Sequence, residues 1–124
     1  MPSFYIADDA QIDDADCPDL AVVALGGEVD YEVSPQLRTH VVRAIKAGRR
    51  RLILDLTDVT FIDSTAIGVI AGAVERLDEA GGGSLAVVCT HEKVLQILEI
   101  TGLDSVITLY RSREDAVSGL ALAG

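Results

Sequence analysis

The stretch that decides the fold is residues 52–74, which read LILDLTDVTFIDSTAIGVIAGAV. Its first five residues are apolar apart from Asp55 and have the pattern of a buried strand. Residues 57–63 follow, and we expect them to form a loop. A helix then begins at Ser64 and ends before the three glycines at 81–83. A strand that leads directly into a helix is typical of an α/β domain.

The same alternation of strand and helix extends outward from this stretch in both directions. Before it we expect a strand near residues 4–6, a strand at 21–25 bounded by Gly26-Gly27, and a helix that has Ser34 as N-cap and Pro35 at its first position and ends at Gly48. After it we expect a strand at 85–89 and a helix that is capped by Thr90, reaches Ile100 and stops at Gly102. The last expected elements are a strand at 106–110 and a helix that starts at the capping box of residues 112–115. This order predicts right-handed crossovers and a partly parallel sheet faced by helices. We therefore expect a single α/β domain over residues 1–124, with a mixed four- to five-stranded sheet and about four helices.

Composition and charge limit the partners that the chain can have. Acidic residues outnumber basic ones 20 to 10, which gives a formal net charge of −10. A chain this acidic is repelled by nucleic-acid phosphates and by anionic lipid. Aromatic residues make up 4% of the chain and Trp is absent, so no base-stacking surface is expected. Residues 8–19 are rich in Asp, and we expect a solvated loop there. These features predict a protein partner, with no nucleic acid and no membrane.

The sequence also indicates the compartment and the absence of a cofactor. No N-terminal segment combines basic residues with a long apolar run, and the most apolar stretch, residues 65–74, is too short to span a bilayer. We therefore expect a cytoplasmic protein. Cys17 and Cys89 are far apart and lack metal-ligand spacing, so we interpret them as reduced thiols, with a redox-sensing pair as the alternative. No motif indicates a metal or a cofactor.

Ser64 is the residue whose position indicates a function. It follows the carboxyl end of an expected parallel strand, where open α/β sheets place their sites, and Asp63 is the expected N-cap of the helix. The positive dipole end and unpaired N–H groups of a helix N-terminus would accept a phosphoryl group on this serine. The same group would add about −1.5 to −2 charges to the surface, and a partner packed over it would have to desolvate or repel them.

The helix that follows Ser64 is apolar on more than one face. Residues 65–74 carry no charged side chain, and only Thr65 is polar. The helical spacing assigns Ile67, Ile70, Ala71, Val74 and Leu77 to the core and leaves Ala66, Val69 and Ala73 for other faces. Such a helix is either fully buried or offers a contact surface, and Gly68 and Gly72 would let another backbone approach closely.

Four motifs occur in order along the chain. They are Gly27-Glu28-Val29-Asp30 as a turn after the second strand, Leu54-Asp55-Leu56 with Val59, Phe61 and Ile62, Asp63-Ser64-Thr65 with Ile67-Gly68, and Ile100-Thr101-Gly102-Leu103. Together they resemble the STAS-domain anti-sigma factor antagonists, the anti-anti-sigma proteins of bacterial partner-switching systems. The resemblance covers about residues 21–120. It implies one STAS-like domain, in which residues 1–19 supply a first strand and an acidic loop.

The resemblance implies a regulatory cycle. The unphosphorylated protein would bind an anti-sigma factor that is also a serine kinase, with ATP and Mg held by that partner, and would so release a sigma factor. The kinase would phosphorylate Ser64 and break the complex, and a PP2C-type phosphatase would reset it. The partner-binding residues carried over by position are Glu28, Val29, Asp30, Asp63, Thr65, Ala66 and Ile67. The family usually has Gly where this chain has Ala66.

Two other functions stay open at this point. One is a STAS scaffold subunit of a larger assembly without a phosphorylation cycle. The other is a hydrolase with Ser64 as nucleophile, but no motif links His40 or His91 to this serine as a base. The chain also lacks a Gly-x-Ser-x-Gly elbow and a Gly-x-x-x-x-Gly-Lys loop. We therefore expect a binding protein and not an enzyme, with Thr65 as a less favoured alternative phosphoacceptor.

Overall fold

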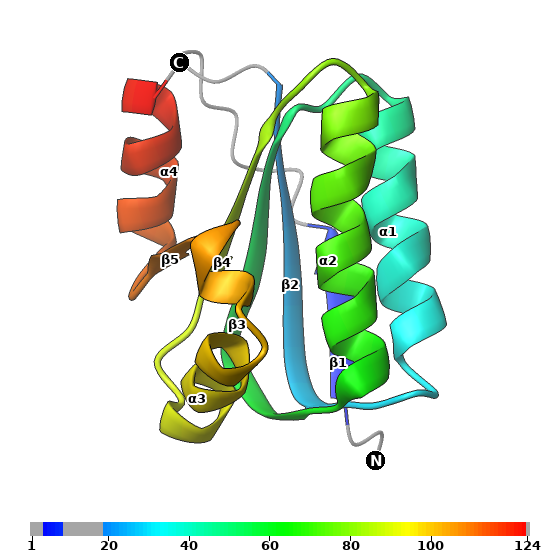
Figure 1. Cartoon of the computed structure of the whole chain (residues 1–124), viewed down its shortest axis with the longest axis vertical. Helices are drawn as coiled ribbons and strands as arrows, with labels where there is room; N and C mark the ends of the chain where they lie inside the picture. Colours follow the sequence, from blue (N-terminus) through cyan, green and yellow to red (C-terminus); the bar gives the residue numbers. More distant parts are fainter. Residues whose placement is uncertain (1–3, 9–18, 124) are drawn as a thin grey trace.

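A computed structural model describes residues 4–8 and 19–123 of the chain (Figure 1). The elements in chain order are β1 (Phe4–Asp8), β2 (Leu20–Val29), α1 (Ser34–Lys46), β3 (Arg51–Ile62), α2 (Ser64–Glu79), β4 (Ser84–Val88), α3 (Glu92–Ile100), the 3-10 helix η1 (Leu103–Ser105), β5 (Thr108–Tyr110) and α4 (Arg113–Ala123). The strands form one sheet in the order β1-β2-β3-β4-β5, in which β1 is antiparallel to β2 and all other neighbours are parallel. The predicted α/β fold with a mixed sheet is confirmed. None of the described helices is long and apolar enough to cross a membrane.

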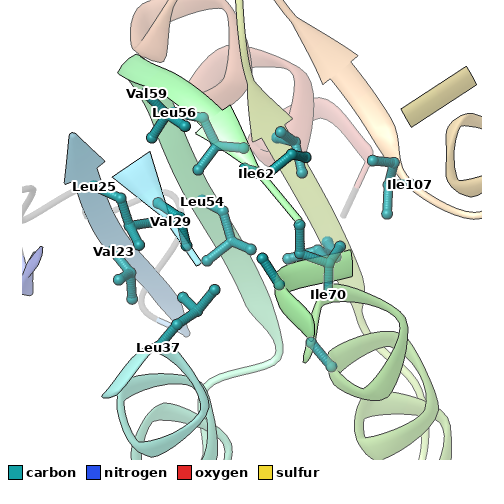
Figure 2. Close-up of a cluster of buried hydrophobic side chains, with 14 of the residues drawn as sticks. Val23, Leu25, Val29, Leu37, Leu54, Leu56, Val59, Ile62, Ile70 and Ile107 are labelled. Atoms are coloured by element: carbon teal, nitrogen blue, oxygen red, sulfur yellow. The ribbon is translucent and has the colours of Figure 1, made fainter. Parts of the chain in front are cut away.

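Helices cover both faces of the sheet because the central strands are apolar on both sides. Leu54 of β3 belongs to a large buried cluster with residues of α1, α2 and α3. Figure 2 shows part of this cluster, in which Leu37 of α1 and Ile70 of α2 meet the strands. Ile53, the preceding residue of β3, points to the opposite face and packs in a smaller cluster with Leu120 of α4. The sheet is therefore the middle of three layers (Figure 1).

Strands β2 and β3 are both longer than the sequence predicts. β2 continues through Gly26-Gly27, and residues 57–62 belong to β3 and not to a loop. The two extensions pair with each other in parallel, with register shifts next to both glycines. The buried residues in this part of β3 are Leu56, Val59 and Ile62, three residues apart. This spacing hides the two-residue alternation by which a strand is recognised in sequence.

Several expected helix ends are confirmed. Asp63 is the N-cap of α2, and the hydroxyl of Ser112 accepts the N–H of Asp115 (3.1 Å) in the first turn of α4. Gly48 after α1 and Gly102 after α3 have φ values of 92° and 79°, which favour glycine. Because η1 follows the second of these glycines, the last strand begins two residues later than predicted.

Two expected N-caps are wrong. Val33 and not Ser34 is the N-cap of α1, and His91 and not Thr90 is the N-cap of α3. Neither residue makes a side-chain capping bond. The side chain of Asp30 accepts the N–H groups of Glu32 and Val33 just before α1, and its carbonyl oxygen accepts that of Ser34 (2.9 Å). The hydroxyl of Ser34 does not cap the helix and contacts the carbonyl oxygen of Asp30 and Thr65 Oγ1.

The buried face of helix α2 matches the prediction in part, since Ile70 and Leu77 are buried as expected. Its buried residues are Ala66, Ile70, Ala73 and Leu77. The assignment of the two alanines to other faces is therefore wrong. The partly buried residues beside this stripe include Ile67, Ala71 and Val74, which the sequence places in the core. Small side chains let a helix lie close to a sheet, so a face built on alanine is missed by a pattern of large apolar residues.

Candidate functional site

The candidate site lies where β2 and β3 end and α2 begins (Figure 1). Val29 pairs with Ile62, and the backbone N–H of Asp63 donates to the carbonyl oxygen of Val29 (3.3 Å). This pairing brings the segment of residues 27–30 next to the segment that contains Ser64, as the sequence motifs suggest. Residues 27–29 are the end of β2 itself, however, and do not form a turn after it.

Asp63 fixes the first turn of α2. Its Oδ1 accepts the backbone N–H groups of Thr65 (3.0 Å) and Ala66 (3.1 Å) and also the hydroxyl of Thr65 (2.5 Å). The hydroxyl of Thr65 is the main cause that lowers the pKa of Asp63 below its ordinary value of 3.8; burial opposes this, and the backbone N–H groups, including that of Tyr31, add to it. Asp63 is therefore an anion at neutral pH.

The neighbouring hydroxyls of Ser64 and Thr65 have different surroundings. Ser64 is exposed, and its hydroxyl makes no hydrogen bond within residues 4–8 and 19–123. The hydroxyl of Thr65 contacts Asp63 and lies 3.0 Å from that of Ser34. A group added to Ser64 therefore breaks no bond of the fold, whereas a group added to Thr65 would disrupt the cap. The geometry favours Ser64 over Thr65 as a residue to be modified.

Ser34 connects α1 to α2 at this site. Its side chain is buried, its hydroxyl lies within hydrogen-bonding distance of the carbonyl oxygen of Asp30 (2.8 Å), and it also contacts Thr65 Oγ1 (3.0 Å). Asp30 Oδ1 in turn accepts the N–H groups of Glu32 (2.9 Å) and Val33 (3.3 Å) at the start of α1. Asp63 thus caps the first turn of α2, Asp30 binds the residues that lead into α1, and the Ser34–Thr65 contact joins the two helices.

An exposed and partly aromatic surface surrounds Ser64. Tyr31 is 67% exposed and Phe61 is 47% exposed. Tyr31 lines the same surface hollow as Thr65, and Phe61 pairs across the sheet with the exposed Glu28. We define the Ser64 patch as Glu28, Tyr31, Phe61, Ser64, Thr65 and Ile67. The sequence analysis did not predict that these two aromatic residues are exposed. The sequence signal for the exposure of Phe61 is its position between Val59 and Ile62, which are the two core residues of the β3 extension.

The predicted partner-binding residues do not all lie on this surface. Glu28 and Thr65 are exposed, Asp30, Asp63 and Ile67 are half-buried, and Val29 and Ala66 are buried. Val29 and Ala66 are each 1% exposed because one points into the core from β2 (Figure 2) and the other faces the sheet from α2. Their side chains therefore do not reach a partner that docks on the surface. The alanine that stands in place of the family's glycine is a core residue here.

Other groups that could carry chemistry are placed away from Ser64. His40 lies on α1 and His91 precedes α3, and Ser64 is hydrogen-bonded to neither of them. In the ranges that the structure covers, no cluster of His, Cys, Asp and Glu is arranged to hold a metal ion. Cys89 is buried, and this burial raises the pKa of its thiol. Cys17 lies outside the described residues, as does most of the acidic loop, so the redox-pair hypothesis stays a prediction.

Comparison with known proteins adds relatives in sequence and in structure. The family model described as STAS domain matches residues 11–116. An anti-sigma F factor antagonist of Paenibacillus polymyxa is 29% identical over 100 residues, which cover 80% of this chain and 85% of that protein. An anti-sigma-B factor antagonist of Bacillus subtilis strain 168 is 33% identical over 95 residues, which cover 77% of this chain and 85% of that protein. The crystal structure of an anti-sigma factor antagonist from Mycobacterium paratuberculosis has the same fold, with a TM-score of 0.80 and 24% identity over 95% of this chain and 94% of that chain.

Proposed function

The chain belongs to the STAS domain family, and on that premise we propose that it is an anti-sigma factor antagonist switched by phosphorylation of Ser64. The unphosphorylated Ser64 patch binds an anti-sigma factor, which then releases its sigma factor. The anti-sigma factor is also a serine kinase that holds ATP and Mg and transfers the terminal phosphoryl group to Ser64 Oγ. A PP2C-type phosphatase hydrolyses the phosphoserine and restores binding. The two relatives in sequence, both named anti-sigma factor antagonists, support this assignment.

The observation that carries the proposal is the placement of the Ser64 hydroxyl. It is exposed, has no hydrogen bond within the described ranges, and lies at the capped N-terminus of α2. A kinase can reach such a hydroxyl without unfolding the helix. The surrounding patch includes Tyr31 and Phe61, whose exposed rings are the kind of side chain that protein interfaces use as anchors.

A phosphoryl group on Ser64 affects the fold and the complex in opposite ways. The positive end of the α2 dipole accepts the added negative charge, so the fold is preserved. The anionic Asp63 borders the patch, and the patch itself contains the exposed acidic side chain of Glu28. A docked partner would bury the phosphate among these groups, and an unpaired buried charge is strongly unfavourable. Phosphorylation therefore dissociates the complex.

The same proposal makes the chain a binding protein and not an enzyme. Within residues 4–8 and 19–123, Ser64 has no hydrogen-bonded base that would activate it as a nucleophile. The net charge of −10 disfavours nucleic acid and anionic lipid as partners. We place the protein in the cytoplasm, where sigma factors and their regulators act, with no metal or cofactor of its own.

The test is capture of the kinase followed by measurement of binding and phosphorylation. Wild-type chain is used to capture ATP-binding proteins from the source bacterium, and the recovered kinase is purified and incubated with the chain and Mg-ATP. We expect mass spectrometry to locate phosphate on Ser64 and to find none in Ser64→Ala. Ser64→Asp should weaken binding by more than about tenfold, because it adds part of the phosphate charge to the patch.

The matched control is Ser118→Asp, which introduces the same charge at an exposed position of α4 on the other face of the sheet. It should bind the kinase like the wild type. Unchanged affinity of the kinase for Ser64→Asp, together with absence of phosphate at Ser64, would contradict the switch. If the chain then also elutes from gel filtration as a large homo-assembly, the scaffold function replaces it.

A further inference from the structure

A groove runs between α1 and α2 beside the Ser64 patch. The two helices lie next to each other on one face of the sheet (Figure 1). The α1–α2 groove has a volume of about 320 Å³ and is lined by Arg38, Thr65, Gly68, Val69, Gly72 and Arg76. An adjoining hollow of about 460 Å³ shares three of these residues and extends to Tyr31. Thr65 and Tyr31 belong to the Ser64 patch, so the patch and the groove form one continuous surface.

The groove contains two glycines at positions where neither the backbone conformation nor close packing within the described residues requires glycine. Among the described residues, no atom outside the local helix lies within 4 Å of a Cβ placed on Gly68 or Gly72, and neither residue has a positive φ. At Gly26, by contrast, a Cβ would lie 2.0 Å from the ring of Tyr5. Glycine is among the least favourable residues inside a helix. Two such residues one turn apart, both open to the outside, indicate close approach by another chain.

The groove also contains two arginines that have no partner among the described residues. Arg38 lies on α1 and Arg76 lies on α2. Neither forms a hydrogen bond or an ion pair with any residue in the described ranges. The chain as a whole has twice as many acidic as basic residues, 20 against 10, so partners of opposite charge are abundant elsewhere on its surface. Guanidinium groups bind carboxylates through two parallel hydrogen bonds.

We propose that the α1–α2 groove binds an acidic segment of the anti-sigma factor, a partner whose identity rests on the proposed function. The segment passes closely over Gly68 and Gly72, and its carboxylates pair with Arg38 and Arg76. A spacing of four residues along α2 relates Gly68, Gly72 and Arg76, which together span roughly 12 Å. The two glycines and the charged side chain of Arg76 therefore lie along one side of the helix. The positive groove selects an acidic segment, although the net charge of the chain would attract a basic one.

The groove and Ser64 make separable contributions to the complex. The groove supplies contacts that phosphate does not touch, whereas the patch supplies the contacts that phosphate removes. Because Thr65 joins the two surfaces, one partner covers both. Variants of the groove therefore change affinity in the unphosphorylated state and need not change phosphate transfer at saturating kinase.

The experiment measures dissociation constants by calorimetry, with the purified anti-sigma kinase recovered by the wild-type chain as the probe. Arg38→Glu, Arg76→Glu and Gly72→Leu should each raise the dissociation constant by more than about tenfold. Gly72→Leu fills the groove at a position where space for its Cβ exists, so its melting temperature should equal or exceed that of the wild type. The matched control Arg111→Glu makes the same charge change at an exposed residue just before α4 and should stay within about twofold of the wild type.

Each outcome decides between the two proposals. If the three groove variants bind within about twofold of the wild type while Ser64→Asp disrupts the complex, the groove proposal is overturned and the proposed function stands. If the groove variants weaken binding while Ser64→Asp does not, and no phosphate is found at Ser64, the groove is supported and the phosphorylation switch is overturned. If Arg111→Glu weakens binding as much as Arg38→Glu does, net charge explains the effect and the groove proposal falls.

Discussion

At the scale of the residue, the carboxylate of Asp63 organises the site. One of its oxygens accepts two backbone N–H groups and the hydroxyl of Thr65, while the hydroxyl of Ser64 takes no part. Asp63 therefore stabilises the local structure of the site, whereas Ser64 supplies the hydroxyl that can be modified. Substitutions can separate the two roles, since changes at Asp63 affect stability and changes at Ser64 affect the surface.

Asp63→Ala should destabilise the protein, because the first turn of α2 loses its cap. The expected loss is about 0.5–2 kcal/mol in the free energy of unfolding. Asp63→Asn is the matched control, since asparagine keeps one side-chain oxygen and caps helices about as well as aspartate. Urea denaturation followed by circular dichroism measures both variants. Equal stability of Asp63→Ala and the wild type would show that the cap is not needed.

Cys89 should be unreactive in the folded protein. Its side chain is buried, and burial raises the pKa of the thiol, so both access and the thiolate fraction are low. We expect iodoacetamide to label the peptide that contains Cys89 only after denaturation, as measured by mass spectrometry. Rapid labelling under native conditions would contradict the burial of this residue and would revive a redox role for it.

At the scale of the element, an ion pair fastens α4 to β3. Arg113 Nε donates to Asp55 Oδ2 (2.9 Å), and the backbone N–H of Thr57 donates to Asp55 Oδ1 (3.0 Å). Burial alone raises the pKa of Asp55, but the hydrogen bonds from Thr57 and the bond and charge of Arg113 outweigh it, so the pKa lies below its ordinary value of 3.8. The stability that this carboxylate contributes is complete above its unfolded-state pKa and is lost as the pH falls through the lower folded-state value.

Arg113→Gln should therefore lower stability and move acid unfolding to higher pH. Loss of the charged partner leaves a buried carboxylate under-satisfied, at a cost of about 1–3 kcal/mol near neutral pH. The pKa of Asp55 should rise, so its contribution is lost at a less acidic pH. Circular dichroism as a function of pH measures the midpoint, with the exposed Arg111→Gln as control. An unchanged acid midpoint in Arg113→Gln would show that Asp55 does not depend on this arginine.

Alanine substitutions at two glycines should change the stability of the protein in opposite directions. A Cβ at Gly83, which precedes β4, would lie 2.4 Å from the backbone oxygen of Arg50. Gly83→Ala should destabilise the protein by about 1–3 kcal/mol, because the backbone next to β3 must move. Gly72→Ala meets no such contact and should stabilise α2 by up to about 1 kcal/mol. Thermal unfolding of both variants checks this contrast, which disappears if Gly83 tolerates alanine.

At the scale of the whole molecule, both buried clusters share one sheet. Neighbouring residues Ile53 and Leu54 of β3 are fully buried on opposite faces. Ile53→Ala and Leu54→Ala should each cost about 2–5 kcal/mol, and each variant should still unfold in one transition. Tyrosine fluorescence and far-UV circular dichroism should give coincident curves. A separate early transition in Ile53→Ala would show that the α4 layer unfolds on its own.

The order of elements could be predicted from the sequence because each apolar run is bounded by local signals. Gly48, Gly102 and the capping residues Asp63 and Ser112 mark boundaries through their own backbone or side-chain chemistry. The length of β2 and β3 could not be predicted, because their extensions exist only by pairing with each other across register shifts. Pairing between distant segments produces no hydrophobic periodicity in the sequence of either segment.

The candidate site was predictable to a similar degree. The position of Ser64 and its cap follow from local sequence, and the structure confirms both placements. The buried state of Ala66 and the exposure of Tyr31 depend on how α2 and the β2–α1 connection pack, which is tertiary information. The contact between Ser34 and Thr65 joins residues 31 positions apart, so no local pattern in the sequence could predict it.

In the proposed switch, the Ser64 hydroxyl, which has no hydrogen bond within the described residues, has a consequence for the lifetime of a signal. Esterification of this oxygen leaves every hydrogen bond described for the folded chain intact. Conversion between the two covalent forms then requires no refolding and no slow isomerisation, so its speed depends on the enzymes that act on it. In the proposed switch, a single copy can therefore be recycled many times, and its state is held in one phosphoester bond.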